Sequence, residues 1–169
     1  MTYKNSIPII ALALVAIPTT AMAQDPVAIE IRATSALAEW QHDTNRQLDA
    51  GLARAPSLRG GRANEAVVQV AFDVNGKGEA VNIRTLPGDF NPAAEQAALY
   101  AVRSLDTLDE LPEMANGRSV LANIILANTP ASRDRLADKL AKIEKKRLAS
   151  SGAVASYVTI GAIPTLLAD

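Results

Sequence analysis

Four carboxylates in the second half of the sequence form its densest group of residues capable of acid–base or calcium chemistry. They are Asp106, Asp109, Glu110 and Glu113. Paired carboxylates can exchange protons or bind Ca²⁺, but the spacing of these four lacks the ligand pattern and the invariant glycine of an EF-hand loop. We therefore interpret the group as a solvated acidic loop and expect no metal site there.

The other reactive residue types give no catalytic pattern either. The chain has a single histidine, His42, and no cysteine, which excludes disulfides, thiolate metal sites and a cysteine nucleophile. His42 has polar neighbours and no carboxylate at a ligand spacing, so we expect it to be exposed. No Gly-x-Ser-x-Gly motif accompanies the serines, and the glycines of Arg59 to Arg62 precede a predicted strand, unlike those of a phosphate-binding loop. The sequence thus predicts a binding module without a cofactor, and not an enzyme.

The elements that would position a binding site are clearest from Glu65 to Asn128. Apolar residues alternate from Val68 to Val74, as in a strand with one buried face, and resume at Val81 and Ile83. The intervening Asn75-Gly76-Lys77-Gly78 can reverse the chain tightly, because Asn and Gly tolerate positive φ. These residues predict a β-hairpin.

A helix and a third strand follow the hairpin. Asn91 before Pro92 predicts a helix start, since the Asn side chain can accept a free N–H and proline suits the first helical position. The apolar stripe of this helix is mostly alanine, so it can lie close to a sheet, and we expect it to end before Asp106, because anions are unfavourable at a helix C-terminus. Alternation from Val120 to Leu126 predicts the third strand.

This succession resembles the C-terminal domain of the TonB family of periplasmic energy transducers. The shared residues are Val67 to Asp73, Gly76, Ala80-Val81, Ala94, Ala97 to Leu99, Ala101 to Arg103, Leu111-Pro112 and Gly117, followed by a closing strand. The expected fold is α+β: a small two-layer ββαβ module, residues 65–128, in which helices pack on an antiparallel sheet. The resemblance also implies that a short segment of an outer-membrane transporter is added alongside an exposed strand.

Strand addition uses the unpaired N–H and C=O groups of a sheet edge. We expect the third strand to be that edge, and a protein or peptide partner to bind there. The predicted partner-binding residues are Ser119, Val120, Leu121, Ala122, Asn123, Ile124, Ile125 and Leu126.

Residues 1–23 are typical of a secretory signal. Lys4 precedes an apolar run, Pro18 breaks the run, and the small-residue triplet ending at Ala23 predicts cleavage before Gln24. The run is shorter than the ~20 residues of a membrane-spanning helix. We expect a periplasmic protein without an anchor. A full TonB transducer has an uncleaved anchor and a Pro-rich spacer, so energy transduction by this chain alone is not expected.

The segments that flank the core are predicted to be helical. Residues 24–64 comprise a helix from Val27 to Ala55, with a polar stretch at Gln41 to Asn45 that allows a break, and then a basic connection; Trp40 is expected in the core. Residues 129–169 comprise a basic amphipathic helix and, from Val154 to Ile163, a β-branched run that predicts a strand able to cover the edge.

Charge gives a second hypothesis for the function. The chain has 17 basic and 18 acidic residues, which is no signature of a nucleic-acid-binding protein. The basic helix, however, could hold an envelope-associated structural protein on an anionic surface. The acidic group at 106–113 could be the neighbour of this helix, within the molecule or across a homodimer.

Overall fold

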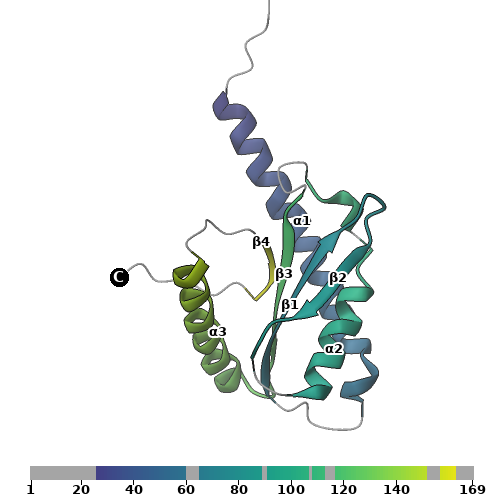
Figure 1. The fold of residues 1–169 in the computed structure, drawn as a ribbon, viewed down its shortest axis with the longest axis vertical. Helices are drawn as coiled ribbons and strands as arrows, with labels where there is room; N and C mark the ends of the chain where they lie inside the picture. Colours follow the sequence, from purple (N-terminus) through teal and green to yellow (C-terminus); the bar gives the residue numbers. More distant parts are fainter. Residues whose placement is uncertain are drawn as a thin grey trace, which may run out of the picture.

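The computed structural model describes residues 26–59, 65–88, 91–106, 108–112, 117–151 and 157–162. In this part of the chain the fold is α+β, with three α-helices and a four-stranded mixed sheet (Figure 1). Its elements are α1 (Pro26–Arg54), the 3-10 helix η1 (Pro56–Leu58), β1 (Ala66–Val74), β2 (Ala80–Thr85), α2 (Pro92–Arg103), the 3-10 helix η2 (Leu108–Glu110), β3 (Ser119–Leu126), α3 (Pro130–Ser151) and β4 (Tyr157–Gly161).

The strands lie in the order β2-β1-β3-β4. β1 is antiparallel to both of its neighbours, whereas β4 is parallel to β3. The expectation of an antiparallel sheet is therefore wrong for its last pair. Parallel neighbours require a crossover connection, and α3 is that connection. The strand predicted from the β-branched run at 154–163 is confirmed as β4.

The sheet is covered on both faces. On one face, α1 and α2 pack over the main core, which includes Phe72, Val102, Ile124 and Ile160. On the other face, α3 packs through Leu136 and Leu140 against Val67. A two-layer module was expected, but α3 adds a third layer, and β1 is consequently buried on both of its faces over most of its length. Figure 1 shows α3 on the opposite side of the sheet from α1 and α2.

The local signals around α2 are confirmed. The Asn91 side chain accepts a hydrogen bond from the N–H of Ala94 at 3.1 Å, Pro92 is the first helical residue, and α2 ends at Arg103. Gly51 of α1 approaches α2 so closely that a Cβ there would lie 2.9 Å from the Ala101 Cα. The small side chains of the α2 stripe thus allow a close approach of α1, a contact that differs from the predicted close packing on the sheet.

Helix α1 differs from expectation in one respect. Trp40 is buried, as predicted, but the polar stretch Gln41 to Asn45 does not interrupt the helix. Thr44 in this stretch is fully buried, and the amides of Gln41 and Asn45 bond to β4. Polar residues here make specific contacts with a strand that is far away in the sequence.

The β1–β2 hairpin is confirmed, with a bulge that the alternation did not reveal. The Asn75 side chain accepts from the N–H groups of Lys77 and Glu79 and so closes the turn. A register shift at Asn82, whose φ is +52°, then separates Val81 from Ile83. Ile83 packs on the main core whereas Val81 lies on the face that carries Asp73, so the two do not share a face as expected.

Some predictions concern residues outside those described. They include the signal segment with its cleavage point between Ala23 and Gln24, most of the basic connection before β1, and Glu113. No helix in the described ranges is both long and apolar enough to cross a membrane.

Candidate peptide-binding site

β3 is not an edge strand over most of its length. From Ser119 to Asn123 it lies between β1 and β4 and is paired with both. The prediction that all of Ser119 to Leu126 is available for strand addition is therefore wrong. The reason is the parallel strand β4, which uses the backbone groups that a partner was expected to take.

The outer edge of β4 is closed by α1. The Gln41 amide donates to the C=O of Thr159 at 2.8 Å, and the Asn45 side-chain oxygen accepts from the N–H of Gly161 at 2.6 Å. The backbone groups of Thr159 and Gly161 point away from β3, whereas the N–H of Ala162 points toward it. Two helix side chains thus substitute for a neighbouring strand and protect this edge, as natural sheets commonly do.

The opposite edge, β2, is protected by its geometry. β2 has six residues, and the bulge at Asn82 interrupts its regular alternation. Bulges bend and twist a strand and so prevent the flat alignment that a further strand requires. Exposed polar side chains at Asn82 and Arg84 add to this protection.

The last part of β3 extends beyond β4. β4 pairs with β3 as far as Asn123, and the N–H of Ala162 donates to the C=O of Asn123 at 2.8 Å. Backbone groups two residues apart in a strand point the same way. The N–H and C=O of Ile125 therefore point away from β1, on the side of β4 but past its end. A proline at Asn123 would break the pairing with β4, so Ile125 is the informative position for testing strand addition.

The register also limits how β4 could continue along β3. Asn123 pairs with Gly161, so the same register would place Ile163 beside Ile125. The C=O of Ile125 would then need a donor from residue 164, which is Pro164 and has no N–H. A regular extension of β4 consequently cannot satisfy this carbonyl.

A hollow of about 410 Å³ lies at this end of β3. Its walls come from α1 and α3, and its floor comes from the ends of β3 and β4. The lining residues are Asn45, Leu48, Asp49, Leu52, Asn123, Ile124, Ile125, Arg133, Ala137, Gly161 and Ala162. The site therefore combines walls that carry both polar and apolar side chains with the end of a strand, which is a composition that a short peptide groove can have.

Asn123 contributes a buried donor to the hollow. Its side chain is 1 % exposed, and its Oδ1 accepts from the Gln69 amide at 2.8 Å on the β1 side. The Nδ2 is the other branch of the planar amide, so it is turned away from β1, and it is itself buried. It has no hydrogen-bond partner within the described structure. A buried donor without an acceptor is costly and favours a ligand that brings an acceptor.

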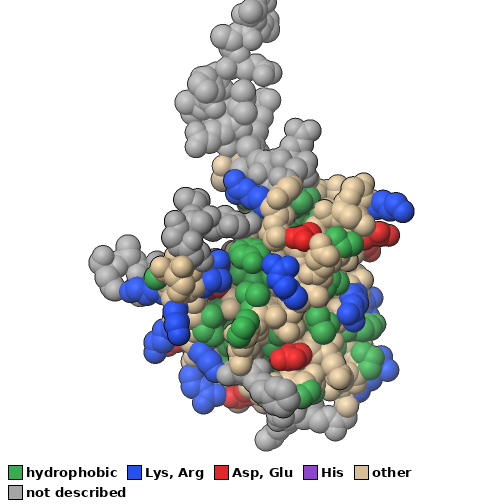
Figure 2. Space-filling view, in the orientation of Figure 1, with side chains coloured by type: hydrophobic (Ala, Val, Ile, Leu, Met, Phe, Trp, Pro, Cys, Tyr) green, Lys and Arg blue, Asp and Glu red, His purple; other side chains and the backbone are tan. Residues whose placement is uncertain are grey.

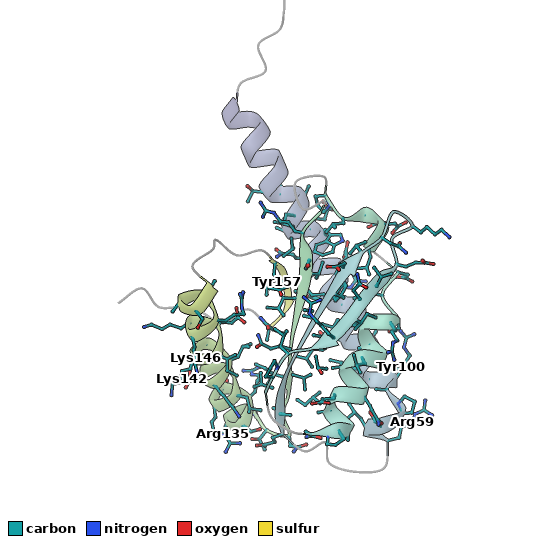
Figure 3. The ribbon with its side chains drawn as sticks, in the orientation of Figure 1. Arg59, Tyr100, Arg135, Lys142, Lys146 and Tyr157 are labelled. Atoms are coloured by element: carbon teal, nitrogen blue, oxygen red, sulfur yellow. The ribbon has the colours of Figure 1, made fainter. Side chains whose placement is uncertain are left out.

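A polar network behind the hollow fixes α3 and β4 to the sheet. Glu144 accepts hydrogen bonds from the Gln69 amide and from Arg147, each at 2.6 Å. The hydrogen bond from Arg147 to Glu144 raises the pKa of the Arg147 guanidinium. The Arg147 guanidinium lies over the ring of Tyr157, 5.4 Å from its centre, and Arg84 approaches the Tyr157 hydroxyl at 3.4 Å; Figure 3 labels Tyr157 on β4.

Comparison with other proteins adds no relative. Neither family models, curated proteins nor solved structures match this chain.

The residues first considered for chemistry lie away from the hollow. His42 is on the exposed side of α1, as predicted. Asp109 and Glu110 are exposed on η2, which packs through Leu108 on the face covered by α1 and α2. Because α3 covers the other face, Asp109 and Glu110 are not its neighbours within the described part of the molecule, contrary to one of the two expectations. The described residues contain no group of three or more side chains suited to a metal ion.

Sequence reasoning missed the α1 side of the site. Asn45, Leu48, Asp49 and Leu52 share one face of α1, because they are three or four positions apart. The available signal was the pair of amides at Gln41 and Asn45, which have the same spacing. Two amide side chains on one helix face can bond to the backbone of a neighbouring strand. Here they bond to the backbone of β4.

Asp49 is expected to lower stability at neutral pH. Asp49 is an exposed residue, but partial desolvation of its carboxyl at the wall of the hollow raises the pKa of this group above the ordinary value of 3.8. The folded chain then binds more protons than the unfolded chain between these two pKa values, so the free energy of unfolding falls as pH rises through that window. We expect Asp49→Asn to unfold at higher temperature than wild type near pH 7, and the difference to disappear at about pH 3.

Thermal unfolding at both pH values checks this prediction. Glu39→Gln, on the same helix but away from the hollow, removes the same charge and corrects for the change in net charge. A difference between Asp49→Asn and wild type that is equal at both pH values would show that desolvation of this carboxylate has no effect on stability.

Proposed function

We propose that the chain is an exported peptide-binding module that takes an extended segment of a partner protein at the free end of β3. The observation that carries the proposal is the register at the end of β3, where the backbone of Ile125 points away from β1, beyond the last β4 residue that pairs with β3 and beside a hollow lined by both polar and apolar residues. Strand addition at this point would form main-chain hydrogen bonds, while Leu52 would contact the partner's side chains.

The TonB resemblance supports the same kind of function. The order β1, β2, α2, β3 agrees with the succession of elements from which the resemblance was drawn. In this proposal the chain is a periplasmic relative of the TonB C-terminal domain, and a segment of an outer-membrane transporter is the first partner to test. The site differs from a free edge strand, since β4 leaves only the end of β3 available. The peptide contact would accordingly be short.

Replacing Ile125 with proline should weaken peptide binding without unfolding the chain. Proline removes the N–H that points away from β1 and puts its ring where the partner's backbone would lie. The ladder with β1 does not use this N–H, and strands tolerate proline where the N–H faces outward. Against peptides selected from a displayed library of random heptapeptides, we expect the affinity of Ile125→Pro to fall by at least about tenfold, the scale of one or two lost main-chain hydrogen bonds.

Ile125→Val is the matched control, because it keeps the N–H and the β-branched shape. Circular dichroism must show that both variants are folded, and amide shifts on peptide titration should centre on residues 124–126. The proposal fails if folded Ile125→Pro binds the selected peptides as tightly as wild type. It also fails if the library yields no peptide that binds near β3.

A further inference from the structure

Helix α3 has a straight row of cations along one side. The row consists of Arg135, Lys139, Lys142 and Lys146. Because these residues are spaced by four, three and four positions, they lie on one side of the helix. The row is about 16 Å long at the helical rise of 1.5 Å per residue. All four residues are exposed. Figure 3 labels Arg135, Lys142 and Lys146 in succession along α3.

The cations of this row do not hold the fold together. The helix packs on the sheet through Leu136, Leu140 and the buried Glu144, which lie on a different side. Arg135 bonds to Glu65 just before β1, and Lys139 also interacts within the molecule. The Arg135 side chain is nevertheless 69 % exposed, and all four cations lie at the surface, where ion pairs contribute little to stability and a charged surface can compete for them.

Charge is unevenly distributed over the molecule. α3 has seven basic and three acidic residues, a net charge of +4, whereas the whole chain has −1, which leaves −5 for the rest. Such an asymmetry turns one side of a protein toward an anionic surface and turns the remainder away. Figure 2 shows Lys and Arg side chains gathered on the side where α3 lies, and in Figure 1 α3 is the outermost element there. A flat surface can therefore approach the row.

We propose that this row binds the surface of an anionic lipid bilayer. The contact is electrostatic, and each cation near the surface raises the affinity for the bilayer about fivefold. The hollow touches α3 through Arg133 and Ala137, and Ala137 is two positions from both Arg135 and Lys139, on the far side of the helix from the row. A chain held by the row would thus keep its candidate peptide site open, and the two sites can be tested separately.

Vesicle sedimentation of the full chain tests the proposal. Wild type should bind vesicles of 30 % phosphatidylglycerol and 70 % phosphatidylcholine at ~50 mM NaCl and be released at ~500 mM, where charges are screened over a few Å. Vesicles of pure phosphatidylcholine measure any attachment that does not depend on charge. Lys139→Gln/Lys142→Gln/Lys146→Gln should lower the partition coefficient about a hundredfold, at about fivefold for each cation removed.

The matched control removes three exposed cations from other elements, as Lys77→Gln/Arg103→Gln/Arg118→Gln. This control has the same net charge as the triple variant in the row. Its partition coefficient should stay within about twofold of the wild-type value if binding is confined to the row. Equal losses in the two triple variants would overturn the proposal, as would equal binding to neutral and anionic vesicles. Binding of soluble polyglutamate with the same dependence on the row, and no binding of vesicles, would overturn the bilayer as the partner.

Discussion

Glu144→Ala is expected to destabilise the fold by about 3 kcal/mol, because it removes one partner of a buried charge pair. The Glu144 side chain is 6 % exposed and that of Arg147 19 %. Without the carboxylate, the Arg147 cation loses its partner in the sheet–α3 interface, and the Gln69 amide keeps only its bond to Asn123. Equilibrium unfolding in urea measures the loss, which should appear in the midpoint and not in the slope.

Two further variants make this prediction specific. Asp138→Ala, at an exposed position on the same helix, should change the free energy of unfolding by less than about 0.5 kcal/mol. The double variant Glu144→Leu/Arg147→Met should be less destabilised than Glu144→Ala, since an apolar replacement leaves no unpaired charge. If Glu144→Ala and Asp138→Ala had the same effect, the network would not hold α3 to the sheet.

Gly161→Ala is expected to detach the end of β4. Gly161 has a φ of +82°, which an L-residue adopts at a cost of about 1–2 kcal/mol. In addition, a Cβ at this position would lie 2.2 Å from the carbonyl oxygen of Asn123, a backbone atom that cannot move without breaking the sheet. The chain must therefore shift away from β3, and the bond from the Ala162 N–H to Asn123 should be lost.

Amide hydrogen exchange at Ala162 reports this detachment directly, and a total destabilisation of about 2 kcal/mol or more should accompany it. Gly117→Ala separates the two causes, because Gly117 also has a positive φ but open space around it. The free energy of unfolding of Gly117→Ala should fall by about 1 kcal/mol, while hydrogen exchange at Ala162 should not change. Protection of the Ala162 amide that is unchanged in Gly161→Ala would contradict the close approach of β4 to β3.

Elements specified by neighbouring residues were predictable from the sequence. The Asn91-Pro92 start of α2, the turn at Asn75, and the third strand all follow from side chains that act within a few positions of one another. The strand at 154–163 was likewise recognisable from its β-branched composition. The bulge at Asn82 was missed, because alternation on both sides of it continues without an obvious break.

The placement of elements relative to one another was not predictable by the same means. Whether β4 would be an edge, and parallel or antiparallel, depends on α3 crossing the far face of the sheet through Leu136 and Leu140. The candidate site depends on that placement entirely, since it exists where β4 ends before β3 does. Its α1 wall depends on contacts such as that of Gln41 with Thr159, and no local pattern encodes a pairing over 118 positions.

The bonds from Gln41 and Asn45 to β4 also bear on the order in which the chain can fold. They join residues 118 and 116 positions apart, which gives the fold contacts of very high sequence separation. During synthesis, α1 and the β1–β2–α2–β3 segment emerge before β4. Until β4 docks, β3 is paired with β1 on one side only, and its other edge is open to partners and to aggregation. The segment α3–β4 therefore protects this edge last, after the rest of the sheet has been made.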